Sequence, residues 1–160
     1  MKTTSILLAA SLAATSLATP LTPRADDPKK IVAQLFDVSS FTAGCLPHGT
    51  QCSISFDVAT NQMPYQTHCT WTGAPLGSSS LPDVGFAAGT CADPTINWSF
   101  RAVANGDAKP LAYEFALVDT EQSLVASKFW IAAAFPLVSA GSSYYQTFTG
   151  QGRFVVYGQE

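Results

Sequence analysis

The clearest shortage in this sequence is charge. Charged residues make up 12% of the chain, against about 25% in typical soluble domains. Residues 31–160 carry nine acidic and four basic residues, a net charge of −5 (4 minus 9), and the basic ones are isolated from one another: Arg101, Lys109, Lys128 and Arg153. Phosphate backbones and anionic lipid surfaces are bound by clusters of Lys and Arg. This distribution therefore argues against nucleic acid and membrane surfaces as partners.

Long hydrophobic runs are also missing. No stretch approaches the roughly 20 apolar residues of a transmembrane helix, so we expect no membrane span. A short apolar run over residues 6–14 follows Lys2 and precedes small residues, which predicts a secretory signal peptide over residues 1–18. Residues 19–30 are proline-rich and charged, and they predict a pro-segment or disordered arm. The remaining residues 31–160 suffice for a single domain.

The second half of the chain has no cysteine. The four cysteines are Cys45, Cys52, Cys69 and Cys91. In an exported protein they predict two disulfides, with three possible connectivities. We favour Cys45–Cys52, which closes a short hairpin loop, and Cys69–Cys91, which ties the ends of a glycine-rich segment. Pairing of Cys45 with Cys69 or with Cys91 is the alternative.

No segment has a persuasive helical periodicity. Short runs of alternating apolar residues between turn residues indicate strands instead; in residues 52–58, for example, the apolar side chains share one face. The expected strands are residues 31–41, 52–58, 65–72, 95–103, 111–118, 124–135, 144–149 and 153–157. They predict an all-β fold, a compact antiparallel β-sandwich or β-barrel of about seven or eight strands stapled by disulfides.

The structure of two segments is less plain from the sequence. The alanines of residues 124–135 favour a helix, whereas Val125, Phe129, Ile131 and Phe135 fit one strand face, and we expect the strand. Residues 73–89 hold so many Gly, Pro and Ser residues that we expect a long surface loop.

Motifs for catalysis and metal binding are absent. There is no Gly-x-Ser-x-Gly sequence, and the two histidines, His48 and His68, have neither zinc-finger spacing nor free thiols beside them. Most acids fall in expected turns, where carboxylates are usually solvated; Glu114 lies within a strand, on the face opposite Tyr113 and Phe115. We therefore expect no catalysis, metal or cofactor.

Recognition residues are expected on the loops of a rigid β scaffold. The candidates are Leu46, Pro47, His48, Gly49, Thr50, Ser78, Ser79, Ser80 and Asp83. Neighbouring residues on a strand point to opposite faces, so one of Tyr144 and Tyr145 should be exposed. Asn97-Trp98-Ser99 is an N-glycosylation sequon. Asn97 is therefore a candidate glycosylation site, although its position within an expected strand argues against its use.

The sequence around the cysteines resembles a known family. It contains Cys-Leu-Pro-His, Cys-Ser-Ile-Ser-Phe-Asp-Val, Thr-His-Cys and Cys-Ala-Asp-Pro-Thr-Ile-Asn-Trp-Ser-Phe. With its N-terminal leader, this pattern resembles small secreted proteins of filamentous fungi related to the major Alternaria allergen and to hypersensitive-response-inducing elicitors. The resemblance implies a β-barrel or sandwich, secretion, and a role at the host interface without known enzymatic chemistry. The allergen's subunits are bridged by an additional N-terminal cysteine; residues 31–44 contain none, so we expect a monomer.

These observations lead to a functional hypothesis. We expect a secreted fungal effector or elicitor-like protein that recognises a plant host protein or cell-surface component through its loops. The alternatives are an extracellular small-ligand-binding β-barrel and a secreted hydrolase with an unrecognised site.

Overall fold

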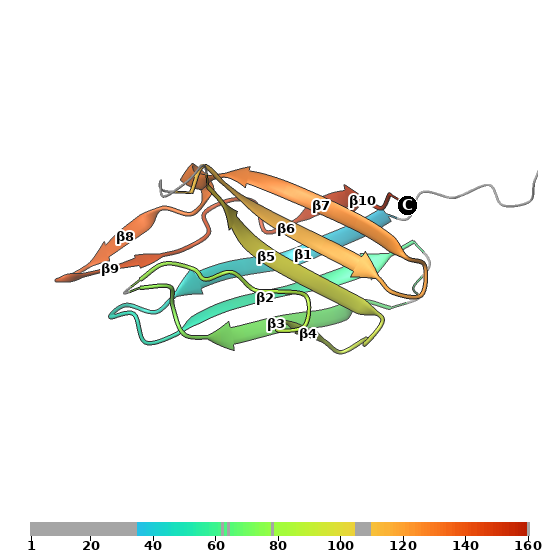
Figure 1. Cartoon of the computed structure of the whole chain (residues 1–160), viewed down its shortest axis with the longest axis horizontal. Coiled ribbons are helices and arrows are strands. Elements are labelled where there is room, and N and C mark those ends of the chain that lie inside the picture. The colour runs from blue at the N-terminus through green and yellow to red at the C-terminus, as the bar shows by residue number, and fades with distance from the viewer. Residues whose placement is uncertain (1–34, 62, 64, 78, 105–109, 160) are drawn as a thin grey trace, which may run out of the picture. The chain divides into compact units, whose positions relative to one another are not determined.

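Antiparallel β-sheets make up the chain from Leu35 onward (Figure 1). The computed structural model describes residues 35–61, 63, 65–77, 79–104 and 110–159. The five-stranded sheet has the order β10 (Phe154–Tyr157), β1 (Leu35–Cys45), β2 (Cys52–Thr60), β3 (Thr67–Gly73) and β4 (Thr90–Cys91). The three-stranded sheet consists of β5 (Ile96–Val103), β6 (Ala112–Asp119) and β7 (Leu124–Ile131). A 3-10 turn (Ala132–Ala134) leads into a ribbon of β8 (Leu137–Ala140) and β9 (Ser143–Gln146).

The all-β prediction is confirmed, and no α-helix occurs in the described ranges. The two larger sheets face each other across one apolar core and are not closed into a barrel. At one edge, Val125 of β7 exchanges two backbone hydrogen bonds with Gln159, just beyond β10. The expected alternation of β2 is also confirmed, because Cys52, Ile54, Phe56 and Val58 are all buried.

Strand β1 changes its inward face halfway along. Phe36 and Val38 are buried before this point, and Phe41 and Ala43 after it. A β-bulge between Ser39 and Thr42 inserts one extra residue relative to β2, which reverses the alternation. The bulge explains why this segment alternates imperfectly in the sequence, and why the strand runs on to Cys45 rather than ending at Phe41.

Aromatic side chains fill the space between the sheets. The ring of Phe41 lies 5.0–6.1 Å from five other rings, namely Phe56, Phe115, Trp130, Phe148 and Phe154. Phe56 in turn contacts Trp98 edge to face at 5.2 Å. Such edge-to-face pairs add about 1 kcal/mol each to the burial of the rings. The interior is thus occupied by the protein's own side chains.

The glycine-rich segment 73–89 was wrongly expected to be entirely a surface loop. Leu81 and Val84 are fully buried, and Val84 exchanges two backbone hydrogen bonds of 2.7 and 2.8 Å with Phe100 of β5. The segment ends at Gly89, where a Cβ atom would lie 2.3 Å from the ring of Trp98. Its two apolar residues therefore anchor it to the core, and only glycine fits at its end.

Residues 124–131 form strand β7, which confirms the choice of strand over helix, but the face expected to be apolar and buried points to solvent. Val125, Phe129 and Ile131 do share a face, but that face is exposed. Leu124, Ala126 and the half-buried Trp130 face the core instead. The 3-10 turn then breaks the alternation, so Phe135 is buried.

Other differences concern the ends of strands. The described residues form ten strands instead of seven or eight, because β4 and β8 are too short to recognise from sequence. β3 begins at Thr67, leaving Tyr65 exposed, and β9 ends at Gln146. The expected signal peptide, pro-segment and start of the first strand lie outside the described residues.

Candidate recognition surface

Three segments meet at one end of the sandwich, on the left in Figure 1. They are the hairpin tip 46–51 between β1 and β2, the segment 74–80, and the β8–β9 ribbon, residues 137–146; together we call them the loop end. Backbone hydrogen bonds join them: Gln146 N donates to Ser79 O (3.0 Å), and Phe148 N donates to Ala43 O (2.7 Å) beside the tip. Of the predicted loop residues, Ser78 lies outside the described ranges.

The hairpin tip is held by covalent and hydrogen bonds. The Cys45–Cys52 disulfide joins directly paired residues of β1 and β2. Leu46 N donates to Gln51 O (2.8 Å), and Gly49 N donates to Leu46 O (3.1 Å). The second disulfide, Cys69–Cys91, joins β3 to β4. Both are the pairs that the sequence favours.

His48 sits at a strained position of the tip. The turn from Leu46 to Gly49 has Pro47 second and His48 third, with φ of +72° at His48. This matches a type II turn, whose third residue is normally Gly or Asn. A side chain in the left-handed region costs about 1 kcal/mol, and the side chain of His48 is exposed. Strain of this kind often marks a functional residue.

Gln146 ties the β8–β9 ribbon to the segment 74–80 and to the core beneath it. It is buried, and its Oε1 accepts a hydrogen bond from Leu81 N (2.9 Å). Its Nε2 donates to Phe135 O (3.0 Å) and to the Tyr113 hydroxyl (2.6 Å). Burial raises the pKa of Tyr113, so its hydroxyl stays protonated. No signal in the sequence could find this residue, because strict alternation groups Gln146 with the exposed Tyr144.

The loop end presents an uncharged surface. Its three segments contain no Asp, Glu, Lys or Arg. Four large side chains on it, Leu46, Leu76, Leu137 and Tyr144, are between 52% and 62% exposed. Tyr144 is the exposed member of the Tyr144-Tyr145 pair, as predicted, while Tyr145 packs against the core. Tyr, Ser and Gly, which are abundant here, are also the residues that antibody loops use for binding.

A groove lies beside the hairpin tip. It has a volume of about 340 Å³ and is lined by Gly44, Leu46, Ser53, Thr147 and Phe148, among others. Its wall mixes backbone, hydroxyl and apolar groups without a charge, so it suits an apolar side chain flanked by hydrogen-bonding groups.

Comparison with known proteins assigns neither a family nor a function to this chain. No family model, curated protein or solved structure matches this chain. Across the described ranges, no helix is long and apolar enough to span a membrane.

The remaining predicted residues lie elsewhere. Asp83 accepts a hydrogen bond from Ala102 N (2.7 Å), which ties it to β5. His68 lies 2.8 Å from Asp57 across β2 and β3. Glu114 pairs with Arg101 on the outer face of the three-stranded sheet. All four cysteines are in disulfides, and no three His, Cys, Asp or Glu of the described ranges could hold a metal ion together.

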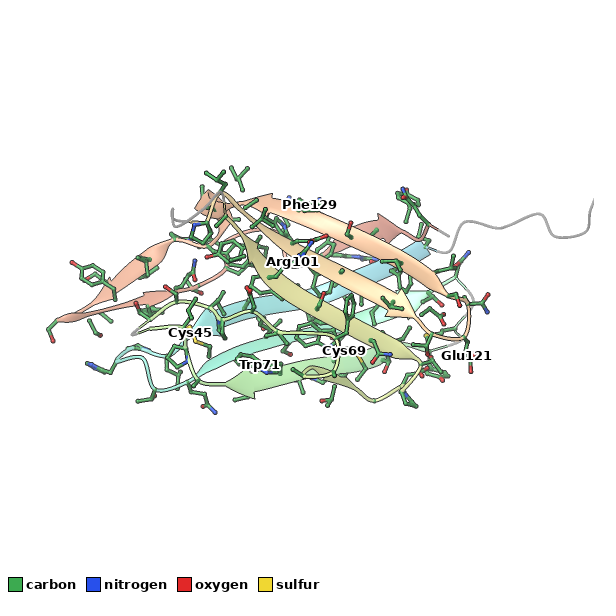
Figure 2. All side chains as sticks on the ribbon, viewed as in Figure 1. Cys45, Cys69, Trp71, Arg101, Glu121 and Phe129 are labelled. Atoms are coloured by element: carbon green, nitrogen blue, oxygen red, sulfur yellow. A yellow bond between two sulfur atoms is a disulfide. The ribbon has the colours of Figure 1, made fainter. Side chains whose placement is uncertain are left out.

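Acidic residues gather at the end of the sandwich opposite Cys45, where Figure 2 labels Glu121. Asp93 accepts hydrogen bonds from Thr95 N (2.9 Å) and Thr95 Oγ1 (2.7 Å), and these lower its pKa. Asp119 accepts bonds from the backbone of the turn that follows it. These carboxylates hold turns in place, but Asp119 is buried and not solvated as expected.

Proposed function

We propose that this protein is a secreted fungal effector or elicitor-like protein that binds a plant host protein or cell-surface component, and that it acts by binding rather than catalysis. The observation that carries the proposal is the loop end: an uncharged surface of exposed Leu, Tyr, Ser and Gly residues on a covalently stapled scaffold. Secretion is supported by the leader sequence and by the two disulfides, which persist in oxidising compartments.

Rigidity supports a binding role for this surface. Ordering a flexible loop costs about 0.5–1.5 kcal/mol for each side chain immobilised on binding. Here the disulfide, the tip hydrogen bonds and Gln146 fix the loops in advance. The binding free energy of a partner at the loop end is therefore not reduced by the cost of ordering these loops.

The filled interior favours surface recognition over carriage of a small ligand. A ligand-binding barrel requires a hollow centre, whereas Phe41, Phe56, Trp98 and Phe115 pack ring against ring here. Three acids, Asp93, Asp119 and Glu121, line a groove at the opposite end of the sandwich. Asp93 and Asp119 accept hydrogen bonds from turn residues there, which favours a structural role for these carboxylates over hydrolysis.

Infiltration into leaves tests the proposal. Purified, folded protein is infiltrated into leaves of several plant species, and cell death and the oxidative burst are measured. Protein that has been reduced and alkylated at its four cysteines is the control. We expect a local response to the folded protein that the control does not elicit. Absence of a response in every species would contradict the elicitor role.

A further inference from the structure

The outer face of the three-stranded sheet is unusually apolar for a surface. Val125, Phe129 and Ile131 of β7 lie on it with 47%, 57% and 73% of their surface exposed. Figure 2 labels Phe129 and Arg101 on this sheet. A groove of about 430 Å³ runs over the face, and its walls include Phe86, Ser99, Ala116 and Val125. Apolar patches of this kind mark places that another molecule covers.

Asn97 lies beside this groove. It pairs with Val118 of β6, which pairs in turn with Val125 of β7. Asn97 and Ser99 are partly exposed on the outer face, while Trp98 between them is fully buried in the core. No hydrogen bond joins the Asn97 side chain to any residue in the described ranges.

These three residues are the chain's one N-glycosylation sequon. We propose that Asn97 carries an N-linked oligosaccharide whose first sugars lie over the groove of the outer sheet face. The fold answers the objection that the sequon lies within a strand, since β5 is an edge strand of its sheet and both Asn97 and Ser99 point outward.

The attachment needs a donor and an extended acceptor. The donor is an oligosaccharide linked to a lipid pyrophosphate. The amide nitrogen of Asn97 forms a bond to C1 of the first N-acetylglucosamine and loses one proton. The C1–O bond to the pyrophosphate breaks, and the lipid pyrophosphate leaves with the electron pair. Transfer to the growing chain precedes strand pairing, so the folded protein must only leave Asn97 outside its core.

The groove fits the sugars that would follow. The apolar faces of sugar rings pack on aliphatic and aromatic side chains, which Ala116, Val125 and Phe86 supply. Polar groups that can bond to sugar hydroxyls, Arg101 and Glu114, stand further along the same groove. Arg101 is four residues from Asn97 on β5, a distance of about 13 Å along the strand. The occupant is thus a short oligosaccharide attached at one end of the groove.

Expression of the full chain in a eukaryotic secretory host tests attachment. The intact mass of the secreted protein is measured for the wild type, Asn97→Gln, Ser99→Ala and the control Ser127→Ala. Ser127 lies on the same face, across Ala116 from Ser99, but outside the sequon. We expect a glycan on the wild type and on the control, and none on the other two variants. Secreted wild-type protein without a glycan would overturn the proposal.

Dye binding tests whether the sugars cover the groove. The fluorescence of 8-anilinonaphthalene-1-sulfonate reports exposed apolar surface, and we expect it to be at least about twofold higher for Asn97→Gln and Ser99→Ala than for the wild type and Ser127→Ala. Adding Val125→Ser to Asn97→Gln should return it to the wild-type level. Equal fluorescence of all the singly substituted proteins would contradict the covering. Neither assay depends on a host partner, so failure here is distinguishable from failure of the proposed function.

Discussion

Gln146 is the residue that holds the β8–β9 ribbon and the segment 74–80 together. We predict that Gln146→Ala leaves the Leu81 N–H and the Phe135 carbonyl without their bonds and lowers the free energy of unfolding by about 2–4 kcal/mol. Urea unfolding measures this. The exposed Gln151→Ala is the matched control and should change stability by less than about 0.5 kcal/mol. Equal midpoints for the two variants would contradict the role of Gln146.

The lowered pKa values of Asp37 and Asp93 let us predict how the free energy of unfolding depends on pH. Hydrogen bonding to Arg153 lowers the pKa of Asp37, and hydrogen bonds from Thr95 lower that of Asp93, both from an ordinary value of 3.8. In acid the unfolded chain binds these protons first. The stabilisation is therefore complete above about pH 5, and it is lost as the pH falls through the lowered pKa values of the folded state.

Urea midpoints measured between pH 7 and pH 2 check this dependence. We expect a steady decline below about pH 4. Arg153→Gln removes the partner of Asp37 while keeping its carboxylate, so its decline should be shallower than that of the wild type. An identical slope in this variant would show that the pair contributes nothing to the acid sensitivity.

At the residue level, the sequence predicts burial correctly where it depends only on the alternation of side chains along a strand. The buried faces of residues 52–58 and the exposure of one tyrosine in Tyr144-Tyr145 follow from the period of two. The burial of Gln146 and the bulge between Ser39 and Thr42 do not follow from this period, because each depends on a partner that is distant in sequence. Gln146 accepts a hydrogen bond from Leu81 N, and in the bulge Phe41 N donates to the carbonyl of Gly152.

Among the elements, the two disulfides differ in the length of chain they close. Cys45–Cys52 spans 7 residues and Cys69–Cys91 spans 22. In the chain-entropy model, we predict that Cys69→Ala with Cys91→Ala costs about 1 kcal/mol more than Cys45→Ala with Cys52→Ala. The two double variants are compared by thermal unfolding. A larger loss for the shorter loop would indicate that strain and packing outweigh loop entropy at these sites.

Strand β7 shows the limit of apolar patterns for predicting elements. Val125, Phe129 and Ile131 lie on the outer face, while the core face carries Leu124, Ala126 and Trp130. The ring of Trp130 packs against Phe41 and Phe154 of the opposite sheet, and these contacts turn its face of β7 toward the core. Hydrophobicity therefore indicates the strand correctly, but the opposite sheet decides which face is buried.

For the whole molecule, the all-β class follows from short alternating segments and frequent turns, whereas the loop end does not follow from the sequence. The sequence indicates its first two segments through the Cys45–Cys52 loop and the serine run. The third, the β8–β9 ribbon, joins the second through a tertiary hydrogen bond from Gln146 N to Ser79 O. Asp83 is close to these loops in sequence, but the hydrogen bond that it accepts from Ala102 N holds it beside β5 instead.

The central claim is that the loop end, and not another surface, is recognised. The direct measurement compares leaf responses to two triple variants across a dilution series. One carries Leu46→Ser, Leu76→Ser and Tyr144→Ser at the loop end; the other carries Val125→Ser, Phe129→Ser and Ile131→Ser on the outer sheet face. All six wild-type side chains are between 47% and 73% exposed, and thermal unfolding checks that both variants are folded.

We predict that the loop-end variant requires at least about tenfold more protein for the same response, because removing a few central side chains abolishes most of the binding energy of an interface. The outer-face variant should respond like the wild type. A full response from the loop-end variant, together with a lost response from the outer-face variant, would contradict the account.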